Sequence, residues 1–376
     1  MEYILYALAY APSLLAFLVL LSFLVFIHEC GHFFAARKSG VTVEEFGFGL
    51  PPRAKTLFIR GGTRFSLNWI PFGGFVRLKG ENAANERERT AKGSFGAASI
   101  PARIIILVGG VFMNFLFAMI ILTLGFSLWN WIPTYMSLEE LRDAAVRGDI
   151  AMQAGVDIVN LRKDGPAEKA GVLPKSVLLA VDGEEVFIPG DVVGHQKGKT
   201  SVAYTLRLPD GTQTILDVPV EKEGTTGIEI QFTPDVSAPN HSLPRAVLLS
   251  LREAKVMTVQ TVAGLGGLAV SLLSKARVPE GITGPVGIVV LTHDSLQEGF
   301  MPYLRLVALL SLSLAVLNIL PFPALDGGRL LFVIIESFIR RRIPMSFANA
   351  VNMIGFSLLM ILMVVVTYKD IAKLFW

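Results

Sequence analysis

The chain has 376 residues, of which 52% are hydrophobic and 17% are charged, and its formal net charge is +3. Soluble domains usually carry about 25% charged residues, so this composition disfavours a soluble enzyme. No block of Lys and Arg with interleaved aromatics points to nucleic acid as a partner. The single cysteine, Cys30, excludes an intrachain disulfide.

Long uncharged runs predict transmembrane helices. Each of four runs is long enough for the roughly 20-residue helix that spans a bilayer. They cover residues 3–27, 104–138, 306–325 and 343–368. A fifth run, 256–274, is rich in Gly, Ser and Thr. We interpret it as part of an amphipathic, interfacial helix over 244–275.

The first uncharged run is followed directly by the string His28-Glu29-Cys30-Gly31-His32. Histidines four residues apart on a helix point to one side, about 40° from each other, so both can hold one zinc ion. Glu29 lies about 100° round the helix from His28, which suits a general base. Ionisable groups at membrane depth are costly and usually functional. The string therefore predicts a catalytic metal site within the membrane.

The loop after the first run is basic. Between Arg37 and Arg103 it contains 12 Lys or Arg residues and 5 Glu residues. The positive-inside rule places this loop, and the arginines 340–342 before the last run, in the cytoplasm. The region 139–300 and both termini are then expected outside. If 256–274 also crossed the membrane, the arginines 340–342 would face outward.

The middle of the external region predicts a small β-rich domain. Residues 156–232 alternate short apolar runs with turn sequences. The segments 202–208 and 214–220 flank Asp210-Gly211 and are expected to pair as a hairpin. Residues 164–172 predict a turn, a short helix and a glycine stop. A domain of roughly 80 residues can fold alone.

Two histidines leave a catalytic zinc site incomplete, because such sites usually take three protein ligands and a water. Asp326 is the candidate for the third ligand, since it ends the third uncharged run. In the predicted topology the first and third spans run in the same direction. We therefore expect Asp326 to lie near His28 and His32, at the cytoplasmic face.

Helix-breaking residues surround this aspartate. Pro321, Pro323 and the pair Gly327-Gly328 are expected to break the third helix. Broken backbone at membrane depth is tolerated where protein or water surrounds it. The sequence thus favours a water-accessible cavity beside the metal, which hydrolysis requires.

Together these motifs resemble those of the site-2 protease family of intramembrane zinc metalloproteases. The family pairs H-E-x-x-H in the first core helix with N-x-x-P-x-P-x-L-D-G in the third, and both are complete here, at 28–32 and 318–327. Further likeness lies in residues 71–76, 109–115 and 284–288. With four spans and an external PDZ-like module, nearly the whole chain resembles the bacterial regulator-of-sigma-E protease group.

The resemblance implies particular roles for the motif residues. Zn²⁺ would be held by His28, His32 and Asp326, with Glu29 as the catalytic base. Asn318 would be a second catalytic residue, contacting the substrate backbone or the developing oxyanion, which fits an amide donor near a metal.

A substrate-binding segment is also implied. Residues 71–78 resemble the membrane-associated β-hairpin of the family. An exposed strand edge can bind an extended peptide by strand addition. Gly73, Gly74 and Phe75 are therefore the expected substrate-binding residues.

The expected fold class is an α-helical membrane protein of about four transmembrane helices, with a membrane-associated β-hairpin and an inserted small β-rich PDZ-like domain. Its regions are an N-terminal membrane core (1–138), the external PDZ-like domain (139–235), an interfacial amphipathic helix region (236–300) and a C-terminal membrane core (301–376).

The resemblance also implies a location and partners. The chain would be a multi-pass protein of the bacterial cytoplasmic membrane, in contact with the lipid bilayer, with the PDZ-like domain outside. Its substrates would be single-span membrane proteins, such as anti-sigma-factor-like proteins or remnant signal peptides, cut within their transmembrane segments.

Two other functions are alternatives to an intramembrane protease. A metal carrier or sensor would bind zinc without hydrolysis, and Glu29 speaks against it because a carrier needs no base beside the metal. An inactive scaffold would present only the external module, although every catalytic position is filled. Two histidines and one carboxylate also suit iron or cobalt.

Overall fold

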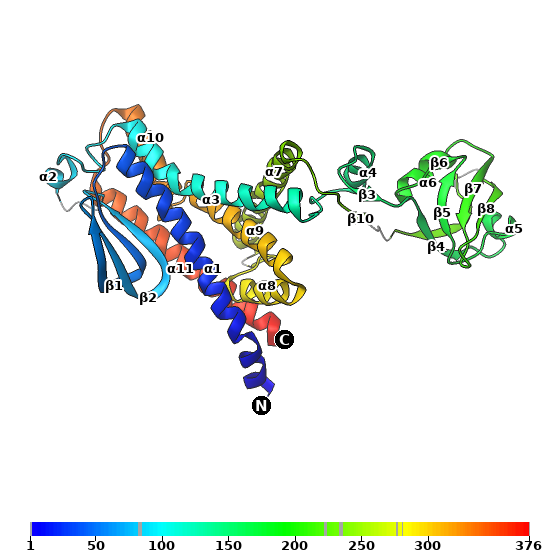
Figure 1. Ribbon diagram of the computed structural model, residues 1–376, viewed down its shortest axis with the longest axis horizontal. Helices are drawn as coiled ribbons and strands as arrows, with labels where there is room; N and C mark the ends of the chain where they lie inside the picture. Colours follow the sequence, from blue (N-terminus) through cyan, green and yellow to red (C-terminus); the bar gives the residue numbers. More distant parts are fainter. Residues whose placement is uncertain are drawn as a thin grey trace. The chain divides into compact units, whose positions relative to one another are not determined.

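The computed structural model describes residues 2–81, 85–221, 224–232, 236–275, 277–279 and 281–375. The chain forms two compact units, one of Met1–Gly125 with Ala246–Trp376, the other of Phe126–Arg245. The helices that build the first unit are α1 (Glu2–Lys38), α2 (Glu86–Arg89), α3 (Ile100–Leu128), α7 (Leu243–Lys275), α8 (Pro285–Glu298), α9 (Phe300–Ile319), α10 (Asp326–Ile339) and α11 (Met345–Phe375) (Figure 1).

Five helices in the described part of the chain are long and apolar enough to cross a membrane. They are Tyr10–Lys38, Ile100–Leu128, Leu243–Ser274, Phe300–Ile319 and Met345–Lys373. The expectation of a mainly helical membrane protein that also contains β-sheet is thus confirmed. The additional helix compared with the four expected is α7, which we interpreted as interfacial. Its length and composition also allow a full crossing.

The hairpin that follows α1 is larger than the segment 71–78 expected from the sequence. Strands β1 (Val43–Arg60) and β2 (Thr63–Leu78) both fold back on themselves. The first half of β1 pairs on one side with residues 64–67 and on the other side with residues 74–78. Residues 74–78 of β2 therefore form an edge, paired on one side only among the described strands (Figure 1).

The helix before the predicted aspartate ends earlier than expected. α9 stops at Ile319, and Leu320 already has an extended backbone. The prolines at 321 and 323 cannot donate a helical hydrogen bond, so the chain continues irregularly until α10 begins at Asp326. The break was predicted. The placement of Asp326 at the end of the third span was wrong, because this residue opens the next helix.

Packing in the first unit holds α1, the hairpin and α3 together. Ala36 of α1, Val43 and Leu78 of the hairpin and Ile106 of α3 share one buried apolar cluster. A second cluster joins α3, α7 and α9 through Ala118, Met257 and Leu312, among others. Close packing of these side chains fixes the helices that carry the site, because van der Waals contact holds helices together where lipid surrounds them.

The second unit contains a mainly antiparallel sheet. Its strand order is β8-β7-β5-β4-β9, with β6 on β5, and β3 pairs separately with β10. The elements are α4 (Leu138–Val146), β3 (Ala151–Met152), β4 (Val156–Leu161), α5 (Pro166–Lys169), β5 (Val177–Val181), β6 (Glu184–Glu185), α6 (Pro189–Gln196), β7 (Ser201–Arg207), β8 (Gln213–Pro219), β9 (Ile228–Gln231) and β10 (Val236–Ser237).

Two local predictions for this unit are confirmed. β7 and β8 pair as the expected hairpin around Asp210-Gly211. The short helix α5 lies within 164–172 and is followed by Gly171, whose φ of +86° suits a glycine stop. The compact unit, Phe126–Arg245, is wider than the region 139–235 expected from the sequence.

Candidate metal centre

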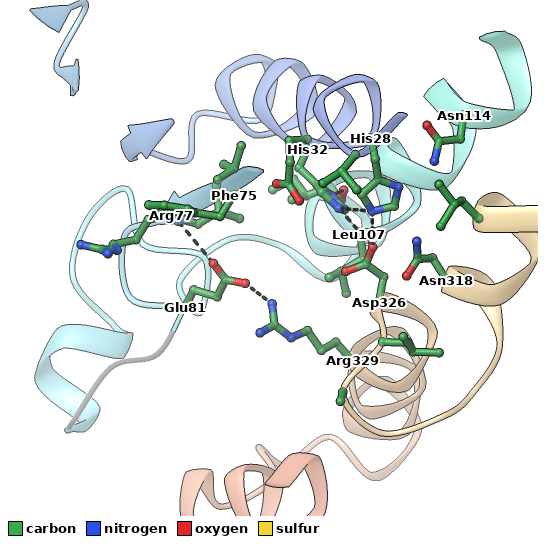
Figure 2. Close-up of a pocket in the computed structure, with 18 of the residues that line it drawn as sticks. His28, His32, Phe75, Arg77, Glu81, Leu107, Asn114, Asn318, Asp326 and Arg329 are labelled. Atoms are coloured by element: carbon green, nitrogen blue, oxygen red, sulfur yellow. Dashed lines mark hydrogen bonds and ion pairs between the residues drawn. The ribbon is translucent and has the colours of Figure 1, made fainter. Parts of the chain in front are cut away.

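Three side chains from distant parts of the chain meet at one point. Nε2 of His28 lies 2.8 Å from Oδ2 of Asp326, and Nε2 of His32 lies 3.1 Å from the same oxygen. The two Nε2 atoms are 3.1 Å apart. Figure 2 shows both imidazoles and the carboxylate directed toward each other, from α1 and from the first residue of α10.

The donor set fits a divalent metal ion. Zinc bonds to imidazole nitrogen or carboxylate oxygen at about 2.0–2.2 Å in a tetrahedron, so its ligand atoms lie roughly 3.3 Å apart. The three separations of 2.8–3.1 Å approach this spacing. Two ring nitrogens that share one carboxylate oxygen are the arrangement expected of three ligands to a single ion.

A second contact orients His32. Its Nδ1 lies 2.8 Å from the backbone carbonyl oxygen of Ile106 on α3. A ligating histidine usually donates its other ring N–H to such an acceptor, which fixes the tautomer and the ring orientation. When the ring proton of a neutral His32 lies on Nδ1, the lone pair of Nε2 is available to a metal.

Close approach of α3 to α1 depends on glycine. A Cβ atom at Gly110 would lie 2.6 Å from Nε2 of both His28 and His32. One at Gly31 would lie 2.1 Å from the carbonyl oxygen of Gly109. Glycines at these crossings therefore let α3 cover the two imidazoles directly.

Glycine also shapes the approach to Asp326. A Cβ atom at Gly327 would lie 2.1 Å from the carbonyl oxygen of Leu320, and one at Gly328 would lie 2.3 Å from that of Phe322. The irregular segment can therefore fold tightly over the first turn of α10. This packing holds the aspartate at the helix start, facing α1.

A cavity of 590 Å³ opens beside the three side chains. The expected catalytic residues Glu29 and Asn318 line it, as does Phe75 from the edge strand. Further polar lining comes from Arg77, Glu81, Asn114 and Arg329. The cavity thus brings together a metal-binding set, a carboxylate, two amides and a strand edge (Figure 2).

The two expected substrate-binding glycines lie next to this cavity rather than in its lining. A Cβ atom at Gly74 would lie 3.9 Å from Cγ of Glu29 and 2.9 Å from the carbonyl oxygen of Gly47. Gly73 has a φ of +70°, a conformation that side chains with a branched Cβ avoid. The backbone N–H of Gly73 donates to Oγ of Ser22 at 3.2 Å, which ties the hairpin to α1.

A buried carboxylate, that of Glu45, stabilises the hairpin. Glu45 is 3% exposed, and it accepts two hydrogen bonds from Arg53 at 2.7 Å and one from Ser66 at 2.8 Å. Burial alone would raise the pKa of Glu45, but the hydrogen bonds from Arg53 and Ser66 hold this pKa below its ordinary value.

A second buried carboxylate joins α3, α10 and the loop after it. Glu336 receives hydrogen bonds from Arg103 at 2.6 Å, from Arg89 at 2.9 Å and from the N–H of Ile343 at 2.9 Å. Burial opposes ionisation, yet these donors lower the pKa of Glu336. The element that carries Asp326 is therefore fixed at both ends.

Several residues at the centre were not predicted individually from the sequence. The carbonyl of Ile106 carries no sequence signal, because any residue supplies one. Gly110 and Asn114 lie in the stretch 109–115, which was noticed only for its family likeness. Two adjacent glycines inside an apolar helix were the available signal, since glycine there is costly unless another backbone comes close.

Comparisons with known proteins agree with this geometry. The model of peptidase family M50 matches residues 16–362. The chain is 30% identical over 365 residues to "Putative zinc metalloprotease CPE1693" of Clostridium perfringens, covering 96% of this chain and 97% of the relative. It is 26% identical over 449 residues to "Zinc metalloprotease RasP" of Shouchella clausii, covering 96% of this chain and 99% of the relative.

Proposed function

The chain belongs to peptidase family M50, and from this premise we propose that it is a zinc metalloprotease that cuts peptide bonds inside the transmembrane segments of single-span membrane proteins. The observation that carries the proposal is the convergence of His28, His32 and Asp326. Both histidines lie on a helix apolar enough to cross a membrane. A hydrolytic centre at that depth acts on bonds that soluble proteases do not reach.

Zn²⁺ is the proposed cofactor, held by Nε2 of both histidines and by the Asp326 carboxylate. When bound there, zinc polarises a carbonyl group and makes water a stronger nucleophile near neutral pH. The distances among the three donor atoms support one shared ion. The hydrogen bond from His32 to Ile106 supports a fixed tautomer and a correctly oriented imidazole.

Glu29 is the proposed general base. It lines the cavity beside the three donors and lies next to His28 in the chain. Its carboxylate takes a proton from the attacking water as the water oxygen bonds to the scissile carbonyl carbon. It then delivers this proton to the departing amine nitrogen as the C–N bond breaks.

Asn318 is the proposed donor to the negative charge that develops on the carbonyl oxygen. It lies in the last turn of α9 and lines the same cavity. Asp326 lines this cavity too (Figure 2), which supports the assignment. A fixed amide N–H at this position stabilises the transition state more than the ground state.

The edge of β2 is the proposed substrate-binding element. Residues 74–78 pair on one side only among the described strands, and Phe75, Val76 and Arg77 line the cavity. An unwound substrate segment can add to this edge as a further strand. Helical substrate must be extended before its carbonyl reaches the metal, and strand addition provides that extension.

The remaining regions are assigned by the same proposal. We place the protein in the bacterial cytoplasmic membrane, with the β-rich unit outside as a PDZ-like domain that restricts access by bulky substrates. In a Cys30→Ser background, a membrane-impermeant maleimide should label Lys163→Cys in intact cells, and Lys92→Cys only after lysis. The reverse labelling pattern would contradict this orientation.

Cleavage by the full chain and by its Glu29→Gln variant tests the function. Both proteins, purified in detergent, are given a single-span membrane protein with a labelled transmembrane segment. We expect the intact chain to cut it and the variant to bind zinc normally without cutting. A metal carrier would show no cleavage with either protein, and equal cleavage by both would remove Glu29 as the base.

A further inference from the structure

Asn114 on α3 has a buried side-chain amide. Its side chain is 0% exposed and lines the cavity beside the metal centre. Among the residues that the structure describes, neither Nδ2 nor Oδ1 has a hydrogen-bond partner. Its backbone, in contrast, is fixed, because Oγ of Ser311 on α9 donates to the Asn114 carbonyl oxygen at 2.8 Å. A buried amide left unpaired costs free energy, because it has lost its hydrogen bonds to water. We therefore expect the Asn114 amide to form an interaction in the working enzyme that offsets this cost.

A second unpaired group lies in the same cavity. Nδ1 of His28 is buried and has no hydrogen-bond partner in the described part of the chain. The equivalent atom of His32 contacts the carbonyl oxygen of Ile106 at 2.8 Å. An imidazole that binds a metal through Nε2 carries its proton on Nδ1. His28 therefore presents a buried donor that needs an acceptor.

Helix geometry brings Asn114 toward this donor. The backbone of α3 reaches the imidazole at Gly110, where a Cβ atom would lie 2.6 Å from Nε2 of His28. Asn114 follows one turn later on the same face of α3. Side chains on a helix lean toward its N-terminus, so the Asn114 carboxamide extends back over Gly110, toward the ring. Both residues line the same cavity (Figure 2).

We propose that Asn114 is a positioning residue whose carboxamide oxygen accepts a hydrogen bond from Nδ1–H of His28 when Nε2 of this histidine binds zinc. The inference rests on the proposed function, because it takes His28 as a ligand. The bond fixes the tautomer and the orientation of the imidazole, and it raises the basicity of Nε2. Each ligating histidine then has an acceptor on α3, a backbone carbonyl for His32 and a side-chain amide for His28.

Zinc affinity of two variants tests the proposal. The full chain, in detergent, competes for zinc with a chromophoric chelator. Asn114→Leu is similar in size but has no acceptor, and it should bind zinc about 10- to 100-fold more weakly. Asn114→Asp loses the amide donor but keeps an acceptor oxygen. It should hold zinc nearly as tightly as the natural chain, and it should cleave substrate when zinc is saturating.

Two controls separate this role from packing. Ser311→Ala removes the bond to the Asn114 backbone while leaving the carboxamide, and its zinc affinity should stay close to that of the natural chain. A loss as large as that of Asn114→Leu would show that the helix contact matters, and would overturn the proposal. His28→Ala should lose the metal, and retention of zinc there would refute the proposed ligand set itself.

Other outcomes also decide against the inference. Unchanged zinc affinity in Asn114→Leu would exclude the proposed hydrogen bond between Asn114 and His28. Weak zinc binding by Asn114→Asp overturns the acceptor role even if the leucine variant fails to fold. If both Asn114 variants hold zinc but cleave poorly at saturating zinc, the amide donates to the substrate instead.

Discussion

The carboxylate of Asp326 lies 2.8 Å from Nε2 of His28, although 298 positions separate the two residues in the chain. The contact joins α1 to the start of α10, directly after the irregular segment 320–325. Both side chains are largely buried, with 9% of His28 and 17% of Asp326 exposed. A buried carboxylate beside two imidazoles is costly unless paired, and a shared metal ion provides that pairing.

Gly110 should be essential for zinc binding. Gly110→Ala adds a Cβ atom 2.6 Å from Nε2 of both histidines, so the rings must leave their positions or α3 must move away. We expect zinc affinity to fall about 10- to 100-fold, as for loss of a supporting partner. Zinc competition measures it. Gly267→Ala is the matched control, because a Cβ atom there meets no described residue within 4 Å, and zinc binding should be unchanged.

Asn318 should affect turnover and not metal binding. Asn318→Asp replaces the amide donor with an acceptor, and loss of one donor to a developing oxyanion costs about 10²–10³ in kcat. Zinc content should stay stoichiometric, and KM should change little. In Asn352→Asp the oxygen that accepts from the N–H of Ala324 is retained, so this control should remain active. Loss of zinc from Asn318→Asp would instead give Asn318 a role at the metal.

The hairpin glycines should affect substrate more than zinc. Gly73→Val forces a branched side chain into a φ of +70°, and Gly74→Val meets the Gly47 carbonyl oxygen at 2.9 Å. Both changes displace the edge at residues 74–78. We expect kcat/KM to fall at least about tenfold, which corresponds to about 1.4 kcal/mol, with full zinc content.

The control for the hairpin is Gly62→Val. It introduces the same kind of strain at the β1–β2 turn, where φ is +82° and a Cβ atom would have no neighbour within 4 Å in the part of the chain that the structure describes. Turnover by this variant should remain normal. Equal losses of zinc and activity in Gly73→Val would argue against a substrate-binding role, and would indicate that the hairpin supports the metal centre.

Acid should loosen the hairpin through Glu45. Its pKa is lower in the folded protein than the ordinary value of 4.5, so the ionised form stabilises the fold. This contribution is complete above about pH 4.5 and disappears as the pH falls through the lowered pKa. We expect limited proteolysis within residues 50–62 to increase below pH 4.5.

Glu45→Gln should be cleaved there already at pH 7, because the Arg53 guanidinium loses its charged acceptor. Glu44→Gln is the neighbouring control, since Glu44 is exposed, and its cleavage should match that of the natural chain at every pH. A hairpin of equal resistance in all three proteins at pH 3 and pH 7 would exclude the stabilising role of Glu45.

Sequence patterns indicated which residues meet at this centre, but they did not indicate correctly where those residues lie within the helices. Spacing within 28–32 and the need for a third ligand pointed to Asp326, because ligand chemistry restricts residue type. They could not show that Asp326 begins a helix, since the prolines mark a break without saying where regular structure resumes. The sequence also did not predict that β1 and β2 fold back on themselves, because the register of strands depends on pairing between residues that are distant in the chain. Asn114 was noticed only within the family-like stretch 109–115 and received no role, because one amide in an apolar run is ambiguous without its neighbours.

X-ray absorption at the zinc edge of the full-length protein tests the central claim most directly. The account predicts one zinc per chain with two imidazole nitrogens at about 2.0–2.1 Å and oxygen at about 2.0–2.2 Å in the remaining positions. Asp326→Ala should abolish this signal. A sulfur neighbour at about 2.3 Å, which only Cys30 or a methionine supplies, or an unchanged spectrum in Asp326→Ala, would contradict it.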